Sequence, residues 1–158
     1  MTNQLPPIPV TLRPIVEGDE GKISEFFDCM GPESRALFNR RDYNRRGVLK
    51  FCAKGDATRR YFMALGEDGR MAGYVFFLDA QTSIPELGLA VRDDLQGQGL
   101  GRYLVEYAIE YAKAEGKGGL LLTTHVANLR AQCLYESSGF ACRGLCKNGT
   151  ELFYLLRF

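Results

Sequence analysis

The sequence is short of several residue types on which common protein chemistries depend. Its 158 residues include no tryptophan, one histidine (His125) and five cysteines without a C-x-x-C pair. A zinc site takes its ligands from His and Cys at close spacing, so this composition gives no basis for a metal centre. An odd number of unpaired cysteines is typical of reduced thiols, and we therefore expect a cytoplasmic protein.

Net charge and long apolar runs are also nearly absent. The formal charge is +1, which gives no electrostatic argument for nucleic acid or for an anionic membrane as a partner. No apolar stretch approaches the roughly 20 residues that a membrane span needs. Residues 1–9 are polar and proline-rich and do not resemble a secretory signal. The basic stretch 40–46, interrupted by Asp42, is interpreted as a solvated face, with a local site for an acidic partner as the alternative.

The remaining pattern predicts one α/β domain over residues 1–158, without repeats or a linker. Apolar runs bounded by turn residues predict strands at 10–14, 61–65, 73–78, 85–91, 120–126, 140–146 and 150–156. Helical periodicity predicts helices from an Asp19 N-cap to Met30, at 34–40, at 99–114 and from an Asn128 N-cap to Ser137. Asp68-Gly69 and Asn148-Gly149 predict hairpin turns. This order describes a mixed, mostly antiparallel sheet flanked by helices, with one parallel crossover.

A glycine-rich loop, Gln96 to Gly101, stands between a predicted strand and the helix at 99–114. Such a turn directs backbone N–H groups at an anion, and the helix N-terminus adds about half a positive charge. Glycine lets a phosphate approach the backbone, because a Cβ would hold it away.

Several interpretations of this loop compete. A P-loop would close with GK[ST], whereas this loop closes with Leu100-Gly101-Arg102. A dinucleotide fold would need GxGxxG spacing and an acid at the end of the next strand, and the sequence has neither. Coenzyme A and a turn without a ligand both remain open from the loop alone.

Two motifs together resemble the GNAT superfamily of N-acetyltransferases. The loop is similar to the superfamily's Gln/Arg-x-x-Gly-x-Gly/Ala motif, and residues 128–140 are similar to its second block, through Asn128, Ala131, Leu134-Tyr135-Glu136 and Gly139-Phe140. The resemblance covers nearly the whole chain from Val10 onward. Within the superfamily, the sequence is similar to the acetyltransferase domain of bacterial protein-lysine acetyltransferases at Leu12-Arg13-Pro14, Asp19-Glu20, Phe26-Phe27 and 32–35.

The resemblance implies a fold, a co-substrate and a reaction. The fold is a GNAT domain whose splayed central strands form an acyl-CoA cleft. The reaction is direct transfer of an acetyl group from acetyl-CoA to a primary amine of a small molecule or protein, without a metal, and a homodimer is compatible with the class. The implied coenzyme-binding residues are Leu89, Ala90 and Val91 through their backbone, the loop residues Gln96, Gly97, Gln98, Gly99, Leu100, Gly101 and Arg102, and Asn128.

Acetyl transfer to an amine has two proton requirements. A lysine-like amine, with a pKa of about 10.4, is only about one part in 10³–10⁴ neutral at pH 7. Glu86 is the candidate base, since it stands in an apolar strand run where desolvation would raise its pKa; a solvated carboxylate at a strand end is the alternative. Tyr135 is the candidate acid, because the motif places it near the coenzyme sulfur; simple packing is the alternative. A structural role is the preferred interpretation of His125, and helix capping alone suffices for Asn128.

Two questions stay open at this level. A non-catalytic acyl-CoA-binding regulatory module would keep the glycine loop without needing Glu86 or Tyr135. The acceptor is expected to be recognised by the region 19–46 and by the hairpin around Asn148-Gly149, but its identity is not encoded in any motif. The arginines at 40, 41, 45 and 46 do not decide between acceptors.

Overall fold

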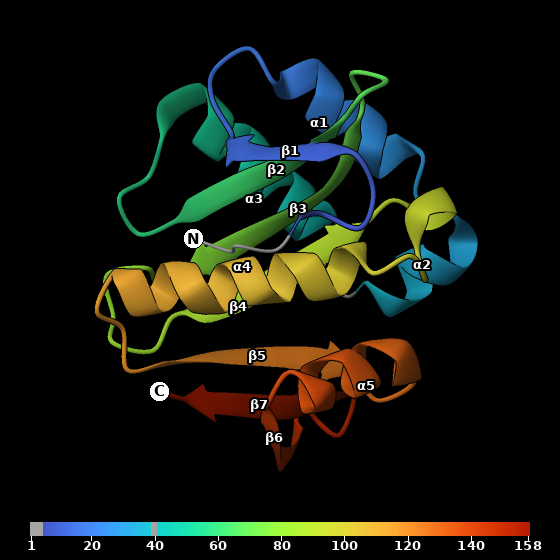
Figure 1. Ribbon diagram of the computed structural model, residues 1–158. Helices are drawn as coiled ribbons and strands as arrows, with labels where there is room; N and C mark the ends of the chain where they lie inside the picture. The colour runs from blue at the N-terminus through green and yellow to red at the C-terminus, as the bar shows by residue number, and fades with distance from the viewer. Residues whose placement is uncertain (1–4, 39–40) are drawn as a thin grey trace.

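The computed structural model describes residues 5–38 and 41–158, with the backbone alone for 41–43. In this part of the chain, seven strands form one sheet in the order β1-β2-β3-β4-β5-β7-β6 (Figure 1). The strands are β1 (Val10–Pro14), β2 (Arg60–Gly66), β3 (Met71–Leu78), β4 (Glu86–Val91), β5 (Gly119–His125), β6 (Ala141–Cys146) and β7 (Glu151–Arg157). The helices are α1 (Glu20–Asp28), α2 (Pro32–Leu37), α3 (Arg41–Lys54), α4 (Leu100–Ala114) and α5 (Leu129–Ser137), with a short 3₁₀ turn, η1 (Asp93–Leu95). The predicted α/β class is confirmed.

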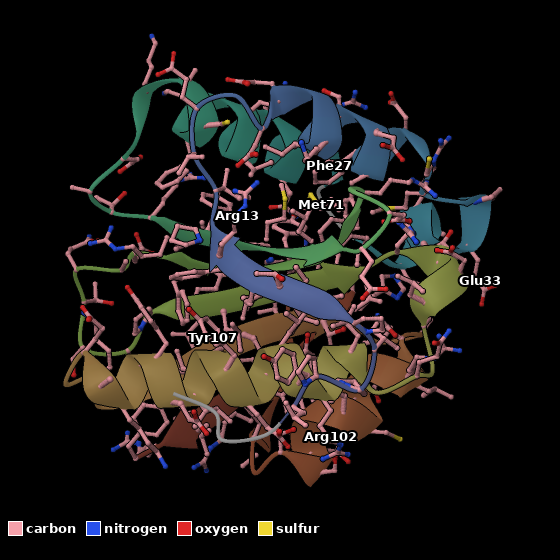
Figure 2. All side chains as sticks on the ribbon, turned by 45° about the horizontal axis from the view of Figure 1, so that its top comes forward. Arg13, Phe27, Glu33, Met71, Arg102 and Tyr107 are labelled. Carbon is pink, nitrogen blue, oxygen red and sulfur yellow. The ribbon has the colours of Figure 1, made fainter. Side chains whose placement is uncertain are left out.

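The helices cover the two faces of the sheet and enclose two apolar cores. On one face, α1 and α3 pack on the first strands, and Figure 2 shows Phe27 and Met71 in this layer. On the other face, α4 lies across the middle of the sheet and buries Leu104 and Tyr107 against it, while α5 contributes Tyr135. Figure 1 shows α2, the N-terminal end of α4 and α5 at the same end of the sheet. The segments that carry the two motifs therefore meet at this end of the sheet.

The central strands β4 and β5 are parallel and diverge almost at once. Their only registered pair in the described structure is Glu86 with Leu121. By contrast, β4 pairs with β3 over six residues and β5 pairs with β7 over seven. Beyond Glu86, the facing edges of β4 and β5 therefore leave backbone groups without a strand partner. The expected splay between the central strands is confirmed.

The turn and capping predictions can be checked residue by residue. Gly69 and Gly149 have φ of 77° and 80°, as the two hairpins require. The Asn128 side chain accepts a hydrogen bond from the Ala131 N–H at 3.2 Å and so caps α5. Asp19 is the N-cap residue of α1, as predicted, but its side chain makes no capping hydrogen bond. Its carboxylate bonds the Arg13 guanidinium at 2.8 Å and the Val16 N–H at 2.9 Å, which ties the end of β1 to the start of α1.

The helices between α1 and β2 differ from the prediction. The short helix expected at 34–40 spans Pro32–Leu37, because proline fits the first turn of a helix, and residues 39 and 40 lie outside the described part. The basic stretch interpreted as a solvated face begins α3, which was not predicted. This helix has Gly47 in its interior and a narrow buried stripe of Val48 and Cys52, so its periodicity is weak. Arg45 pairs with Asp28 at 2.7 Å, at the end of α1.

No helix among the described residues is both long enough and apolar enough to cross a bilayer.

Candidate active site

The glycine loop reaches the N-terminus of α4 through two residues in the left-handed region. Gly97 has φ of 76° and Gly99 has φ of 91°, and an added Cβ at Gly97 would meet nothing within 4 Å. Backbone conformation, rather than lack of space, is thus the first reason for glycine at these positions. At Gly101 the reason is packing, since an added Cβ would lie 3.3 Å from the Leu134 side chain, where α4 approaches α5.

The loop and the first turn of α4 offer unused hydrogen-bond donors. Within the described part of the chain, no acceptor is bonded to the backbone N–H groups of residues 97–102. They stand at a helix N-terminus, where the partial positive charge of the peptide dipoles adds to the donors. This arrangement is suited to the oxygens of a phosphate or pyrophosphate group.

Side chains of the loop and of the first turn of α4 make hydrogen bonds to neighbouring elements. Gln96 accepts a hydrogen bond from Arg130 of α5 at 2.6 Å and donates to the Val91 carbonyl at 3.3 Å. Gln98 donates to the Asp94 carbonyl at 3.3 Å, and Arg102 donates to the Ser137 hydroxyl at 2.8 Å. These contacts tie the loop to β4, η1 and α5.

A cleft of about 730 Å³ runs from the glycine loop along the open edge between β4 and β5. It is lined by predicted site residues from three parts of the chain: Glu86, Leu89, Ala90, Val91, Gln96, Gly97, Gly101, Asn128 and Tyr135. Four other predicted residues do not line it, namely Gln98, Gly99, Leu100 and Arg102. The side chain of Leu100 is buried in the core, and Gly99 serves as the N-cap residue of α4. Their role in coenzyme binding stays a prediction that concerns only the backbone.

The floor of the cleft contains a glycine that could not be replaced without moving its neighbour. Gly88 of β4 pairs with Phe76 of β3, and an added Cβ would lie 2.2 Å from the Phe76 ring. The ring therefore lies over Gly88, and both residues line the cleft. This packing gives the cleft an apolar floor beside the open edge of β4.

Tyr135 enters the cleft from α5, on the face of the sheet that carries α4. Its side chain is 7% exposed and its ring packs against Phe140 and Tyr154, with centroids 5.9 and 6.1 Å away. The Tyr154 hydroxyl donates to Glu136 at 2.9 Å, which fixes α5 on β7 beside Tyr135. Burial raises the pKa of Tyr135 above its ordinary value, so the hydroxyl keeps its proton across the neutral range.

Glu86 lies on the opposite face of the sheet. Successive side chains of a strand alternate between faces, and Leu87 belongs to the core under α4. Glu86, Gly88 and Ala90 therefore face the side of α1 and α2. The half-buried Glu86 carboxylate lines the cleft where β4 and β5 are still paired. An acid and a base on opposite sides of the open edge can serve the two sides of a group held between the strands.

His125 also lines the cleft, but its ring is engaged locally. Its Nδ1 accepts a hydrogen bond from the Ala127 N–H at 3.0 Å, in the turn that leads into α5. This contact agrees with the structural interpretation preferred from the sequence.

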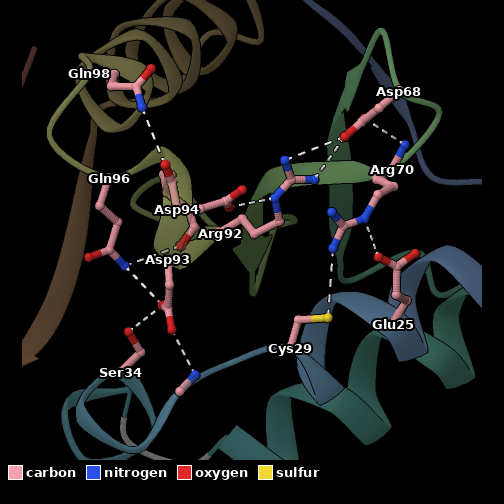
Figure 3. Close-up of polar contacts among 12 residues, drawn as sticks. Glu25, Cys29, Ser34, Asp68, Arg70, Arg92, Asp93, Asp94, Gln96 and Gln98 are labelled. Atoms are coloured by element: carbon pink, nitrogen blue, oxygen red, sulfur yellow. Dashed lines mark hydrogen bonds and ion pairs between the residues drawn. The ribbon is translucent and has the colours of Figure 1, made fainter.

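Sequence reasoning missed a residue that joins the two sides of the cleft. Asp93 accepts hydrogen bonds from the Gly31 N–H at 2.7 Å and from the Ser34 hydroxyl, while Gln96 reaches the same carboxylate at 3.4 Å (Figure 3). Asp93, which is 62 residues from Gly31 in the sequence, thus links the start of α2 to the glycine loop. An added Cβ at Gly31 would lie 2.8 Å from this carboxylate. Nothing in the local pattern around Asp93 indicates so distant a partner.

The fold and the cleft define a class of protein. A mostly antiparallel sheet with one splayed parallel pair, a glycine-rich loop at the mouth of the splay and ionisable groups beside it form the architecture expected of a GNAT domain.

A model of the acetyltransferase (GNAT) family matches residues 23–140, and the chain belongs to that family. Streptothricin acetyltransferase of Streptomyces lavendulae is 34% identical over 92 residues, which cover 57% of this chain and 49% of that protein. The ribosomal protein bS18-alanine N-acetyltransferase of Escherichia coli strain K12 is 33% identical over 91 residues, covering 58% of this chain and 62% of that protein. The chain thus matches less than two thirds of the length of either relative.

Solved structures agree with the fold. The crystal structure of the GNAT domain of S. lividans PAT superimposes with a TM-score of 0.82 at 19% identity, covering 94% of this chain and 90% of that one. At this identity the likeness concerns the fold. Similarity to known proteins therefore supports the family and the architecture, and the acceptor has to be argued from this chain's own residues.

Proposed function

We propose that this protein is an acetyl-CoA-dependent N-acetyltransferase that moves an acetyl group directly to a primary amine. The observation that carries the proposal is the open edge between β4 and β5, which leads from the glycine loop to Tyr135 on one face and Glu86 on the other. The names of the relatives, both acetyltransferases, support the same reaction class.

The donor side fits coenzyme A. The unused N–H groups of residues 97–102 suit the pyrophosphate. The amide-bearing arm would lie along Leu89, Ala90 and Val91, which have no registered partner on β5 in the described structure. Buried backbone groups need partners, and an extended chain with amides of its own supplies them.

Glu86 and Tyr135 would divide the proton transfers between them. Glu86 accepts a proton from the amine, whose lone pair then attacks the thioester carbon. A backbone N–H near the end of β4 donates to the developing oxyanion. As the carbon–sulfur bond breaks, Tyr135 donates its proton to the departing sulfur. The nitrogen gives up two protons in all: the first passes through Glu86 to solvent, and the second, lost as the amide forms, restores the proton of Tyr135.

A thiol-release screen tests the proposal. Acetyl-CoA is offered together with polyamines, aminoglycosides, amino acids and lysine peptides, and free thiol and acetylated product are both measured. Turnover of at least one amine is the expected result. Tight coenzyme A binding without thiol release across the whole panel would favour the non-catalytic acyl-CoA-binding module.

We extend the proposal to the setting of the protein. All five cysteines are free thiols, which suits a reducing cytoplasm. We further propose that residues 1–158 act as one domain and need no metal. The family is compatible with a homodimer, and light scattering at working concentration tests that assembly.

A further inference from the structure

A buried carboxylate on the proposed acceptor side of the cleft takes no part in the proton transfers assigned to Glu86 and Tyr135. Glu151, the first residue of β7, is 3% exposed and lines the same cleft as Glu86. Its strand partner on β5 is His125. Taking a charge out of water is costly unless an opposite charge accompanies it, so Glu151 calls for a cation.

That cation is supplied by the chain itself. The Lys147 ammonium lies 2.5 Å from the Glu151 carboxylate and 3.4 Å from the Thr123 hydroxyl. Lys147 stands in the turn between β6 and β7 with φ of 51°, and its side chain is 41% exposed. A half-exposed lysine on a turn can swing into solvent, whereas the carboxylate on β7 cannot follow it.

Glu151 shares a face of the sheet with Glu86. On β7, Leu152 and Tyr154 belong to the core under α4, so alternation directs Glu151 to the opposite face. Glu86 lies beside Leu121 of β5 and Glu151 beside His125 of the same strand. Four residues of strand correspond to about 13 Å, which is too far for both carboxylates to bond one nitrogen. The cleft that both carboxylates line also has apolar side chains in its wall, including Phe38, Phe76 and Leu78.

We propose that Glu151 binds a second positive charge of the acceptor, in place of Lys147, and so selects small amines with a cationic group at each end of an apolar chain. The inference rests on the proposed function, because it takes the reacting amine to lie at Glu86. Lys147 then acts as a stand-in for the distal ammonium in the free protein and leaves when such an acceptor binds.

Equilibrium binding tests this without any turnover. Diaminooctane and octylamine are titrated by calorimetry into the protein with coenzyme A present, which has no acetyl group to donate. The proteins are the unaltered chain, Glu151→Gln, Lys147→Met and, as a matched control, Glu67→Gln on the exposed β2–β3 turn. We expect Glu151→Gln to weaken diaminooctane binding about tenfold, the size of one charge-assisted contact, and to leave octylamine binding unchanged.

Lys147→Met is expected to change the diaminooctane affinity in the opposite direction. It therefore tests the inference even if Glu151→Gln fails to fold. Removing the competing ammonium should strengthen diaminooctane binding severalfold, and diaminooctane should raise the unfolding temperature of this variant more than that of the unaltered chain. An unchanged ratio of the two amine affinities in Glu151→Gln, or weaker diamine binding in Lys147→Met, would overturn the inference. Absence of acetyl transfer with the diamine still bound in this pattern would contradict the proposed function alone.

Discussion

The two sides of the cleft are built in different ways. The proposed donor side comes from one continuous stretch, 89–140, and presents mainly backbone: a glycine loop, an open strand edge and a helix N-terminus. The proposed acceptor side is assembled from α2 and the residue after it, from β3, from the β6–β7 turn and from the start of β7, and it presents side chains such as Phe38, Lys147 and Glu151. Recognition through backbone groups can be predicted from the sequence, because only certain residues permit the required backbone conformation. Recognition through side chains from distant segments cannot be predicted in this way.

Among the changes that separate the roles of the two sides, loss of the candidate base should have the largest effect on kcat. Glu86→Gln is expected to lower kcat by about 10³-fold, in the upper range for a positioned general base, because the amine must then lose its proton to water. Binding of acetyl-CoA should stay within twofold, since the loop on the donor side is untouched. Steady-state kinetics over pH 6–10 provide the measurement. An acidic limb identical to that of the unaltered chain would remove Glu86 from the role of base.

A smaller loss of turnover is expected at the candidate acid. Tyr135→Phe should lower kcat by about 10²-fold with little change in acetyl-CoA affinity, because the buried hydroxyl only assists the departing thiolate. Tyr107→Phe, in the core under α4 and away from the cleft, controls for loss of a tyrosine hydroxyl, and its kcat should be unchanged. Equal turnover in the two variants would show that Tyr135 only packs.

Binding of acetyl-CoA by the glycine loop can be weakened by a change that affects only the backbone conformation. Gly97→Ala places a Cβ on a residue with φ of 76°, at a strain of about 1–2 kcal/mol, and should weaken acetyl-CoA binding by roughly five- to tenfold. Gly116→Ala is the matched control, since Gly116 has φ of 73°, equally open surroundings and a position after α4, outside the cleft. Comparable losses of affinity in both variants would mean that strain, and not the loop, is being measured.

The smallest effect on activity is expected at Asp19, which stabilises the fold without lining the cleft. Hydrogen bonds from Arg13 lower the pKa of this buried carboxylate, against the opposing effect of burial. Asp19→Asn should cost about 1–3 kcal/mol of unfolding free energy at pH 7 and leave kcat unchanged.

The pH dependence of that difference follows from the sign of the shift. A lowered folded-state pKa adds stability that is complete above the ordinary value of 3.8 and is lost as the pH falls through the folded-state value. The gap between Asp19→Asn and the unaltered chain should therefore close below about pH 4 in urea titrations. A gap that is constant down to pH 2 would contradict this account of Asp19.

The sequence predicted the local geometry of the proposed donor side because the signals for that geometry are local. The glycine loop, the Asn128 cap and the Asn148-Gly149 turn each depend on a few neighbouring residues. Periodicity located α4 and all seven strands to within two residues at either end, but it missed α3, whose buried stripe is narrow. The Asp19 side chain makes no capping hydrogen bond because Arg13, on β1, competes for the same carboxylate.

From the sequence, recognition of the acceptor could be assigned only to two regions, residues 19–46 and the hairpin around Asn148-Gly149. The link from Asp93 to Gly31 joins residues 62 positions apart, and Glu151 looked like an ordinary strand residue until its face and its ion pair with Lys147 were known. A charge in a strand becomes informative only when the three-dimensional structure shows that it is buried.

The central claim is that one cleft binds acetyl-CoA through backbone groups and delivers its acetyl group to an amine on the opposite side. The most direct test follows acetyl-CoA and diaminooctane in one reaction, with free thiol and N-acetylated amine quantified together. The account predicts that both products appear in equal amounts and that Glu86→Gln lowers the rate at which both form by about 10³-fold. Coenzyme A binding by the unaltered chain with no acetylated amine, both here and across the wider amine panel, would contradict it.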